Sequence, residues 1–161
     1  MKVKGLLMLV GAALLIAGCQ LTHPGSSSLA FIEIKGVPME RIRESVIQVF
    51  AEESYKVALP GRSWIVFTRD GTLNDRLQYG RYEESLTMRV EVSLGTYEDG
   101  VLVRLDAFAL QGGEARGSVR VSKLVRRPYM RLLERVKEKA ESTVSNEVKD
   151  QIQEKPSEVK Q

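Results

Sequence analysis

One stretch of the chain alternates strictly between apolar and polar side chains, and it restricts the fold more than any other. It covers residues 86–94 (LTMRVEVSL), where every second side chain, beginning with Leu86, is apolar. Because successive side chains of a strand point to opposite faces, this pattern predicts a strand with one buried and one solvated face. Such strands are typical of antiparallel sheets. We therefore expect an antiparallel sheet that is covered on one face.

The segment after this strand predicts a hairpin. Residues 95–100 (GTYEDG) have the composition of a turn, and a return strand is expected over residues 101–110. One face of that strand is wholly apolar, whereas the other combines Arg104 and Asp106 with three apolar residues, Leu102, Phe108 and Leu110. These three predict either a partner-binding surface or coverage by the long polar segment Arg69–Glu84.

Two amphipathic helices are expected, one before and one after these strands. The first follows Pro38 and ends near Ser54, and its apolar residues recur at helical spacing: Met39, Ile42, Val46, Val49 and Phe50. The second begins at Arg127 and carries an apolar stripe from Tyr129 to Ala140. From residue 144 on, apolar residues recur at four-residue steps, which overshoot the helical turn of about 3.6 residues. Fraying is expected there.

Short strands are also expected at residues 29–35 (LAFIEIK), 63–68 (SWIVFT) and 115–121 (ARGSVRV). The polar segment Arg69–Glu84 is expected to form a loop. Its residues Asp70, Asn74 and Asp75 suggest calcium, but an EF-hand needs oxygens at alternate positions, a central glycine and a closing glutamate. That pattern is missing, so a solvated turn is predicted and no metal site is expected.

These elements predict one α+β domain over residues 29–145, followed by a charged and disordered tail at residues 146–161. The expected architecture is a two-layer sandwich in the order β-α-β-β-β-(β)-α, with both helices on one face of the sheet. This order is similar to that of helix-grip domains in some envelope lipoproteins, including a component of the outer-membrane barrel-assembly machinery.

The first residues have the composition of a secretory signal. Lys2 and Lys4 are followed by an uncharged, largely apolar run at residues 5–16 and by the small residues Ala17 and Gly18. A membrane-spanning helix needs about 20 apolar residues, and this run is shorter. A signal peptide over residues 1–18 is therefore predicted.

The end of this segment, Ile16, Ala17, Gly18 and Cys19, resembles the lipobox of bacterial lipoprotein precursors, with isoleucine where leucine is usual. The resemblance implies cleavage between Gly18 and Cys19, and attachment of acyl chains such as palmitate to Cys19, the only cysteine. Because Gln20 is not aspartate, it also implies the periplasmic face of the outer membrane, or the outer face of the membrane in a cell that has only one. Residues 19–28 are expected to be a flexible linker.

The charge balance of the chain argues against one class of partner, but one basic region has two possible interpretations. Lys2 and Lys4 are two of the 24 lysines and arginines, so the chain after residue 18 carries 22 basic against 21 acidic side chains. That balance argues against nucleic-acid binding. The region Arg116–Lys139 nevertheless has nine basic residues and two acids. It predicts a solvated helix face with ion pairs such as Glu134–Lys137 and Arg135–Glu138. The alternative is contact with anionic lipid, lipopolysaccharide or an acidic protein.

The chemistry of the chain favours binding over catalysis. It has no HExxH, CxxC, GxSxG, P-loop or GxGxxG motif, and its only histidine, His23, lies in the expected linker. No cofactor is expected. The leading hypothesis is a membrane-anchored lipoprotein whose non-catalytic domain binds an envelope protein or glycan, with envelope assembly as one context. The alternative is an envelope hydrolase that uses paired carboxylates.

Overall fold

The computed structural model describes residues 27–80, 85–112 and 117–153, with side chains up to residue 143. The predicted signal peptide, Cys19 and most of the predicted linker lie outside these ranges. So do the end of the Arg69–Glu84 segment and part of the strand expected at residues 115–121.

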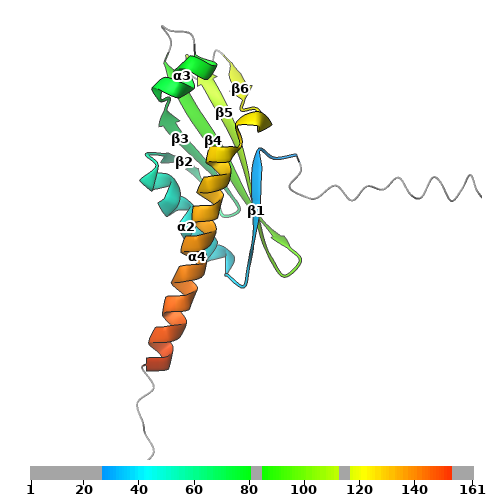
Figure 1. The fold of residues 1–161 in the computed structure, drawn as a ribbon, viewed down its shortest axis with the longest axis vertical. Helices are drawn as coiled ribbons and strands as arrows, with labels where there is room; N and C mark the ends of the chain where they lie inside the picture. The colour runs from blue at the N-terminus through cyan, green and yellow to red at the C-terminus, as the bar shows by residue number, and fades with distance from the viewer. Residues whose placement is uncertain (1–26, 81–84, 113–116, 154–161) are drawn as a thin grey trace, which may run out of the picture.

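The centre of the fold is an antiparallel sheet in the order β1-β5-β4-β3-β2 (Figure 1). The predicted hairpin forms its middle, as the long strands β4 (Leu86–Tyr97) and β5 (Gly100–Gln111). Strand β1 (Ala30–Lys35) pairs with the first half of β5, and the short β6 (Ser118–Arg120) pairs with its second half. Strands β3 (Trp64–Asp70) and β2 (Lys56–Pro60) complete the other side.

Two helices cover one face of this sheet, as predicted. Helix α2 (Met39–Glu52) and helix α4 (Arg127–Gln153) pack against each other and share one hydrophobic core with the sheet. The core side of β4 is the alternating set of apolar residues that runs from Leu86 to Leu94, each at most 4% exposed. The α+β two-layer sandwich is therefore confirmed.

Three elements were not predicted: strand β2, helix α3 and the short 3-10 helix η1 (Lys123–Val125). Every residue of strand β2 is exposed, so its sequence KVALP is not under the constraint that gives a half-buried strand its alternation. It is a short edge strand with an irregular register, and it ends in a proline. Helix α3 (Leu73–Tyr79) lies inside the expected loop, and it buries none of its residues fully. An amphipathic pattern cannot reveal a seven-residue helix without a buried stripe.

Two boundaries also differ from the expectation. The hairpin turn is tighter, because Tyr97 and Gly100 still pair and Glu98 takes the turn with a φ of 49°. Helix α4 continues to Gln153, past the point of expected fraying and into the expected tail. Residues 144–153 contain no glycine or proline and several good helix formers, which explains the continuation. None of the helices in the described ranges is long and apolar enough to cross a membrane.

Candidate functional site

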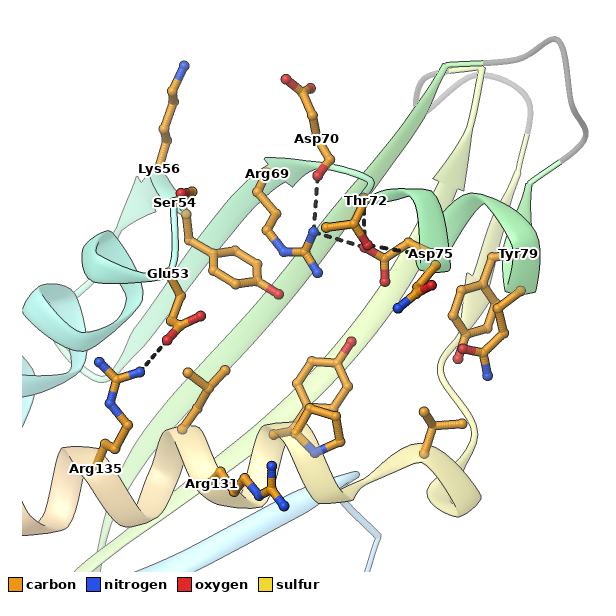
Figure 2. Close-up of a pocket in the computed structure, with 17 residues that line it drawn as sticks. Glu53, Ser54, Lys56, Arg69, Asp70, Thr72, Asp75, Tyr79, Arg131 and Arg135 are labelled. Atoms are coloured by element: carbon orange, nitrogen blue, oxygen red, sulfur yellow. Dashed lines mark hydrogen bonds and ion pairs between the residues drawn. The ribbon is translucent and has the colours of Figure 1, made fainter.

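A pocket of about 910 Å³ opens between the C-terminal end of α2, the end of β3, helix α3 and the start of α4 (Figure 2). Its lining includes three tyrosines, Tyr55, Tyr79 and Tyr129. Ligand pockets in proteins typically have volumes of about 300–1,000 Å³ and combine apolar or aromatic walls with a few polar groups. This pocket is the candidate ligand site of the domain.

The end of α2 places Tyr55 at the pocket. The Ser54 N–H donates to the carbonyl of Ala51 and the Tyr55 N–H to that of Phe50, each at 3.0 Å, while Ser54 has a φ of 63°. This is a Schellman motif, which often includes an apolar contact across the helix end. Here the contact is edge-on packing of Tyr55 on Phe50, with ring centroids 5.4 Å apart. Tyr55 is consequently buried.

Arg69, near the end of β3, connects Tyr55 to α3. Its guanidinium carbon lies 5.0 Å from the centroid of the Tyr55 ring, a cation–π contact, and one of its nitrogens lies 2.9 Å from a carboxylate oxygen of Asp75. The same nitrogen donates to the Asp70 carbonyl at 3.1 Å. Burial alone would lower the pKa of Arg69, but Tyr55 and Asp75 outweigh it and raise the pKa above its ordinary value.

A capping box fixes α3 against this arginine. The Thr72 side chain accepts from the Asp75 N–H at 3.3 Å, and the Asp75 carboxylate accepts from the Thr72 N–H at 2.8 Å. The Thr72 hydroxyl also donates to that carboxylate at 2.7 Å. Burial alone would raise the pKa of Asp75, but these hydrogen bonds and the charge of Arg69 hold it below its ordinary value. Figure 2 shows Arg69, Thr72 and Asp75 converging on one wall of the pocket.

The tyrosine hydroxyls are protonated groups in this environment. Burial raises the pKa of Tyr55, Tyr79 and Tyr129, with Arg69 opposing the shift at Tyr55. The Tyr79 hydroxyl oxygen is inaccessible to solvent and has no hydrogen-bond partner within the described part of the chain. Tyr55 and Tyr129 are buried, whereas Tyr79 is half-buried. Of the three rings, that of Tyr79 is therefore the one with apolar surface accessible to a ligand.

Some polar side chains around the tyrosines form ion pairs within the domain, and others are exposed to solvent. Arg135 pairs with Glu53 and with Glu52, the latter at 2.7 Å. Asn74, Gln78 and Arg131 are exposed members of the lining, and they come from the two helices that flank the pocket. Lys56 and Asp70 are also exposed members of the lining, but Figure 2 shows their side chains pointing away from the tyrosines. Asn74, Gln78 and Arg131 are therefore the polar side chains that we consider for contact with a ligand.

A group of three carboxylates elsewhere in the described ranges is already paired with a cation of the chain, so we do not treat it as a second candidate site. One carboxylate oxygen from each of Glu33, Glu98 and Asp99 lies within 4.8 Å of the other two. The Lys35 ammonium lies 3.2 Å from Glu33 and 2.7 Å from Asp99, so a cation of the chain already compensates this group.

The predicted partner surface is only partly accessible. Leu102, Phe108 and Leu110 lie on the sheet face opposite the helices, as expected, but Leu102 and Leu110 are 3% and 5% exposed and Phe108 is half-buried. Helix α3 lines one pocket with α4, so the described part of its segment, residues 69–80, lies at that pocket and does not cover this face. Near Leu102, the Arg104 guanidinium lies close to Gly95, the residue of β4 that pairs with Leu102.

The basic region is also arranged differently from the prediction. The expected pairs Glu134–Lys137 and Arg135–Glu138 are not among the ion pairs of the described residues. Arg135 and Lys139 instead reach across to Glu52 and Glu53 of α2, and Arg120 pairs with Asp106 of β5. These pairs tie helices and strands together, which a one-dimensional pattern cannot show.

Sequence reasoning missed the pocket, although it noted Asp70, Asn74 and Asp75 as a polar group. The three tyrosines are spread from residue 55 to residue 129 and belong to no motif. The lipidation residue Cys19 and the cleavage residue Gly18 lie outside the described ranges, so their assignment stays a prediction. No protein family model matches the chain, and no curated protein is significantly similar to it.

Proposed function

We propose that this chain is the precursor of a lipid-anchored envelope lipoprotein whose domain binds a glycan, without catalysis, in the pocket between α3 and α4. The anchor rests on the signal-like residues 1–18 and on Cys19. The observation that carries the binding function is the pocket itself, with its three tyrosines and its rim of exposed amide and guanidinium groups.

A sugar ring matches this mixture of walls. Each ring has a face of C–H groups, which suits the half-buried ring of Tyr79, and an edge of hydroxyls, which suits Asn74, Gln78 and Arg131. A concave pocket of about 910 Å³ takes such a ligand better than it takes the flat surface of a protein. A glycan is therefore the ligand class that we favour over an envelope protein.

The acids of the pocket favour binding over hydrolysis. A glycosidase needs two carboxyl groups across one bond, and one of them must stay protonated because its pKa is raised. In this pocket Asp75 has a lowered pKa and is held by Thr72 and Arg69, and Glu53 pairs with Arg135. Both carboxylates are therefore held by other residues of the chain. The third acid of the described lining, Asp70, is exposed and single, so this lining does not offer a pair of unengaged carboxyl groups.

The binding proposal can be tested by nuclear magnetic resonance on the isotopically labelled mature chain. Solubilised peptidoglycan fragments should shift the signals of Tyr55, Tyr79 and Tyr129. Asn74→Ala should weaken binding by about fivefold, the effect of losing one neutral hydrogen bond. Arg131→Ala should weaken it by more than about tenfold, because hydrogen bonds to charged groups are stronger. Gln48→Ala, an exposed change on α2 away from the pocket, should leave binding unchanged. Shifts elsewhere on the domain, or equal binding by all variants, would contradict the proposal.

The anchor can be tested by the intact mass of the protein from the membrane fraction, expressed with its own leader. We expect the mass of the chain from Cys19 plus two or three acyl groups. A Cys19→Ser variant should lack these groups and should not be cleaved at Gly18. A wild-type chain of unmodified mass would refute the anchor and would leave the pocket proposal standing on its own.

A further inference from the structure

The described chain begins beside the short 3-10 helix η1 (Lys123–Val125), which precedes α4. The Ser27 carbonyl accepts from Arg120 at 2.9 Å, and the Leu29 N–H donates to Asp106 at 3.0 Å. Leu29 and Lys123 also line one small surface hollow. Figure 1 shows the same arrangement, with the start of β1 next to η1. The linker from Cys19 therefore joins the domain at this end.

The surface at this end combines an apolar tip with cations. Leu124 is 94% exposed, the highest value among the large apolar residues of the described chain. Lys123, Arg126 and Arg127 surround it in sequence and are exposed as well. We call these four residues the η1 surface. Exposure of an apolar side chain to water is unfavourable, so the packing of the isolated domain does not account for the position of Leu124.

The folding of α4 does not explain these arginines. Helix N-termini favour acidic residues because of the helix dipole, yet Arg126 and Arg127 stand at the start of α4 and its first turn holds no acid. Other cations of the basic region are used internally: Arg120, Arg135 and Lys139 pair with acids of β5 and α2. Within the described ranges, no ion pair includes Arg126 or Arg127.

The linker is too short to keep this end away from a membrane. From Cys19 to Ser27 the chain has eight steps, which span at most about 29 Å when fully extended. The η1 surface lies where that linker enters the domain, so it is the part of the molecule that stays closest to the acyl chains of Cys19.

From these observations we infer that the η1 surface docks on an anionic phospholipid bilayer and orients the tethered domain. Leu124 enters the headgroup boundary, and Lys123, Arg126 and Arg127 contact lipid phosphates. This inference rests on the proposed anchor at Cys19. It adds a second membrane contact that fixes which end of the domain faces the lipid.

The test uses the lipidated protein in vesicles and one reporter thiol. Cys19 is the only cysteine and its sulfur carries the lipid, so Ser122→Cys adds a single reactive thiol next to Leu124. A fluorophore on it should be quenched by nitroxide-labelled acyl chains in vesicles of phosphatidylcholine with phosphatidylglycerol. Quenching should be weaker in phosphatidylcholine alone. The control reporter is Thr96→Cys, at the opposite end of β1 near the hairpin turn, and it should stay unquenched.

Further variants test the charges of the two arginines and the apolar contact of Leu124 separately. Arg126→Gln with Arg127→Gln should lower the ratio of docked to undocked domains about thirtyfold in the anionic vesicles, and Leu124→Ser should also lower it. Arg62→Gln with Lys137→Gln removes the same charge elsewhere and should leave quenching unchanged.

Each outcome decides the inference. Quenching at residue 122 that depends on anionic lipid and on these arginines supports it. Equal quenching at residues 122 and 96, no quenching at either, or an equal effect of both double variants overturns it. If the mass shows acyl groups and residue 122 is not quenched, docking alone fails and the anchor stands. If the mass shows no acyl group, the anchor and the docking inference fail together.

Discussion

Arg69 and Asp75 show how much of the site depends on single residues in an apparently ordinary polar segment. Arg69 packs over Tyr55, 14 positions earlier in the chain, and both partners of the Arg69–Asp75 pair keep less than a fifth of their side chains exposed. The sequence prediction took this segment for a solvated loop, because polar residues without periodicity normally have that role. Only the folded chain brings an aromatic ring to the guanidinium. No local pattern carries that information.

Asp75→Asn should lower stability in a manner that depends on pH. Because the pKa of Asp75 is lowered in the folded state, its carboxylate contributes stability above its unfolded pKa of about 3.9 and loses it as the pH falls through the lower folded value. At pH 7 the variant should unfold with about 1 kcal/mol less free energy than the wild type. The difference should shrink at the most acidic pH at which both chains still fold.

Urea denaturation over a series of pH values measures this difference. Asp70→Asn is the matched control, since that carboxylate is exposed in the same segment and should change stability little. A deficit for Asp75→Asn that stays constant down to acidic pH would show that the carboxylate charge does not matter.

At the scale of elements, the helices and strands with a buried face were predicted from the sequence, whereas some of those without one were missed. Strand β4, helix α2 and the first turns of α4 each have one buried face, and β5 has one fully buried face and a partly buried one. Periodicity located all of them. Strand β2 and helix α3 bury no face fully, so nothing in their hydrophobicity distinguishes them from loops. Helix α3 did carry a capping box, Thr72 with Asp75, which is a local start signal that pattern reading overlooked.

The end of α2 allows a prediction about one element. Ser54 occupies the left-handed position of the Schellman motif, which glycine adopts without the steric cost of a Cβ atom. Ser54→Gly should therefore raise the free energy of unfolding by about 0.5–1 kcal/mol. The urea midpoint should increase at an unchanged m-value. Ser54→Ala is the control: it keeps a Cβ atom at the left-handed position, so its free energy of unfolding should not rise. A glycine variant less stable than the alanine variant would refute the argument.

At the scale of the whole molecule, the pocket exists only because α3 and α4 lie on the same side of the sheet. The sequence predicted that two amphipathic helices share a face, since each has one apolar stripe and the sheet has one apolar side. It could not predict where the turn after β3 would place α3 relative to α4. The site therefore depends on tertiary contacts between segments that are far apart in sequence, such as Arg135 with Glu52 and Glu53.

The same two-layer arrangement predicts which part of α4 the domain needs. The α4 residues in the described core end at Ala140, and Leu133 is fully buried among them. Removing residues 144–161 should change the free energy of unfolding by no more than about 0.5 kcal/mol, because the four-residue spacing of apolar residues there overshoots the helical turn and predicts no continuous apolar stripe. Leu133→Ala should cost about 2–5 kcal/mol, since it leaves a cavity between the layers. Urea denaturation compares the two, and a truncated chain as unstable as Leu133→Ala would mean that the last turns of α4 pack on the domain after all.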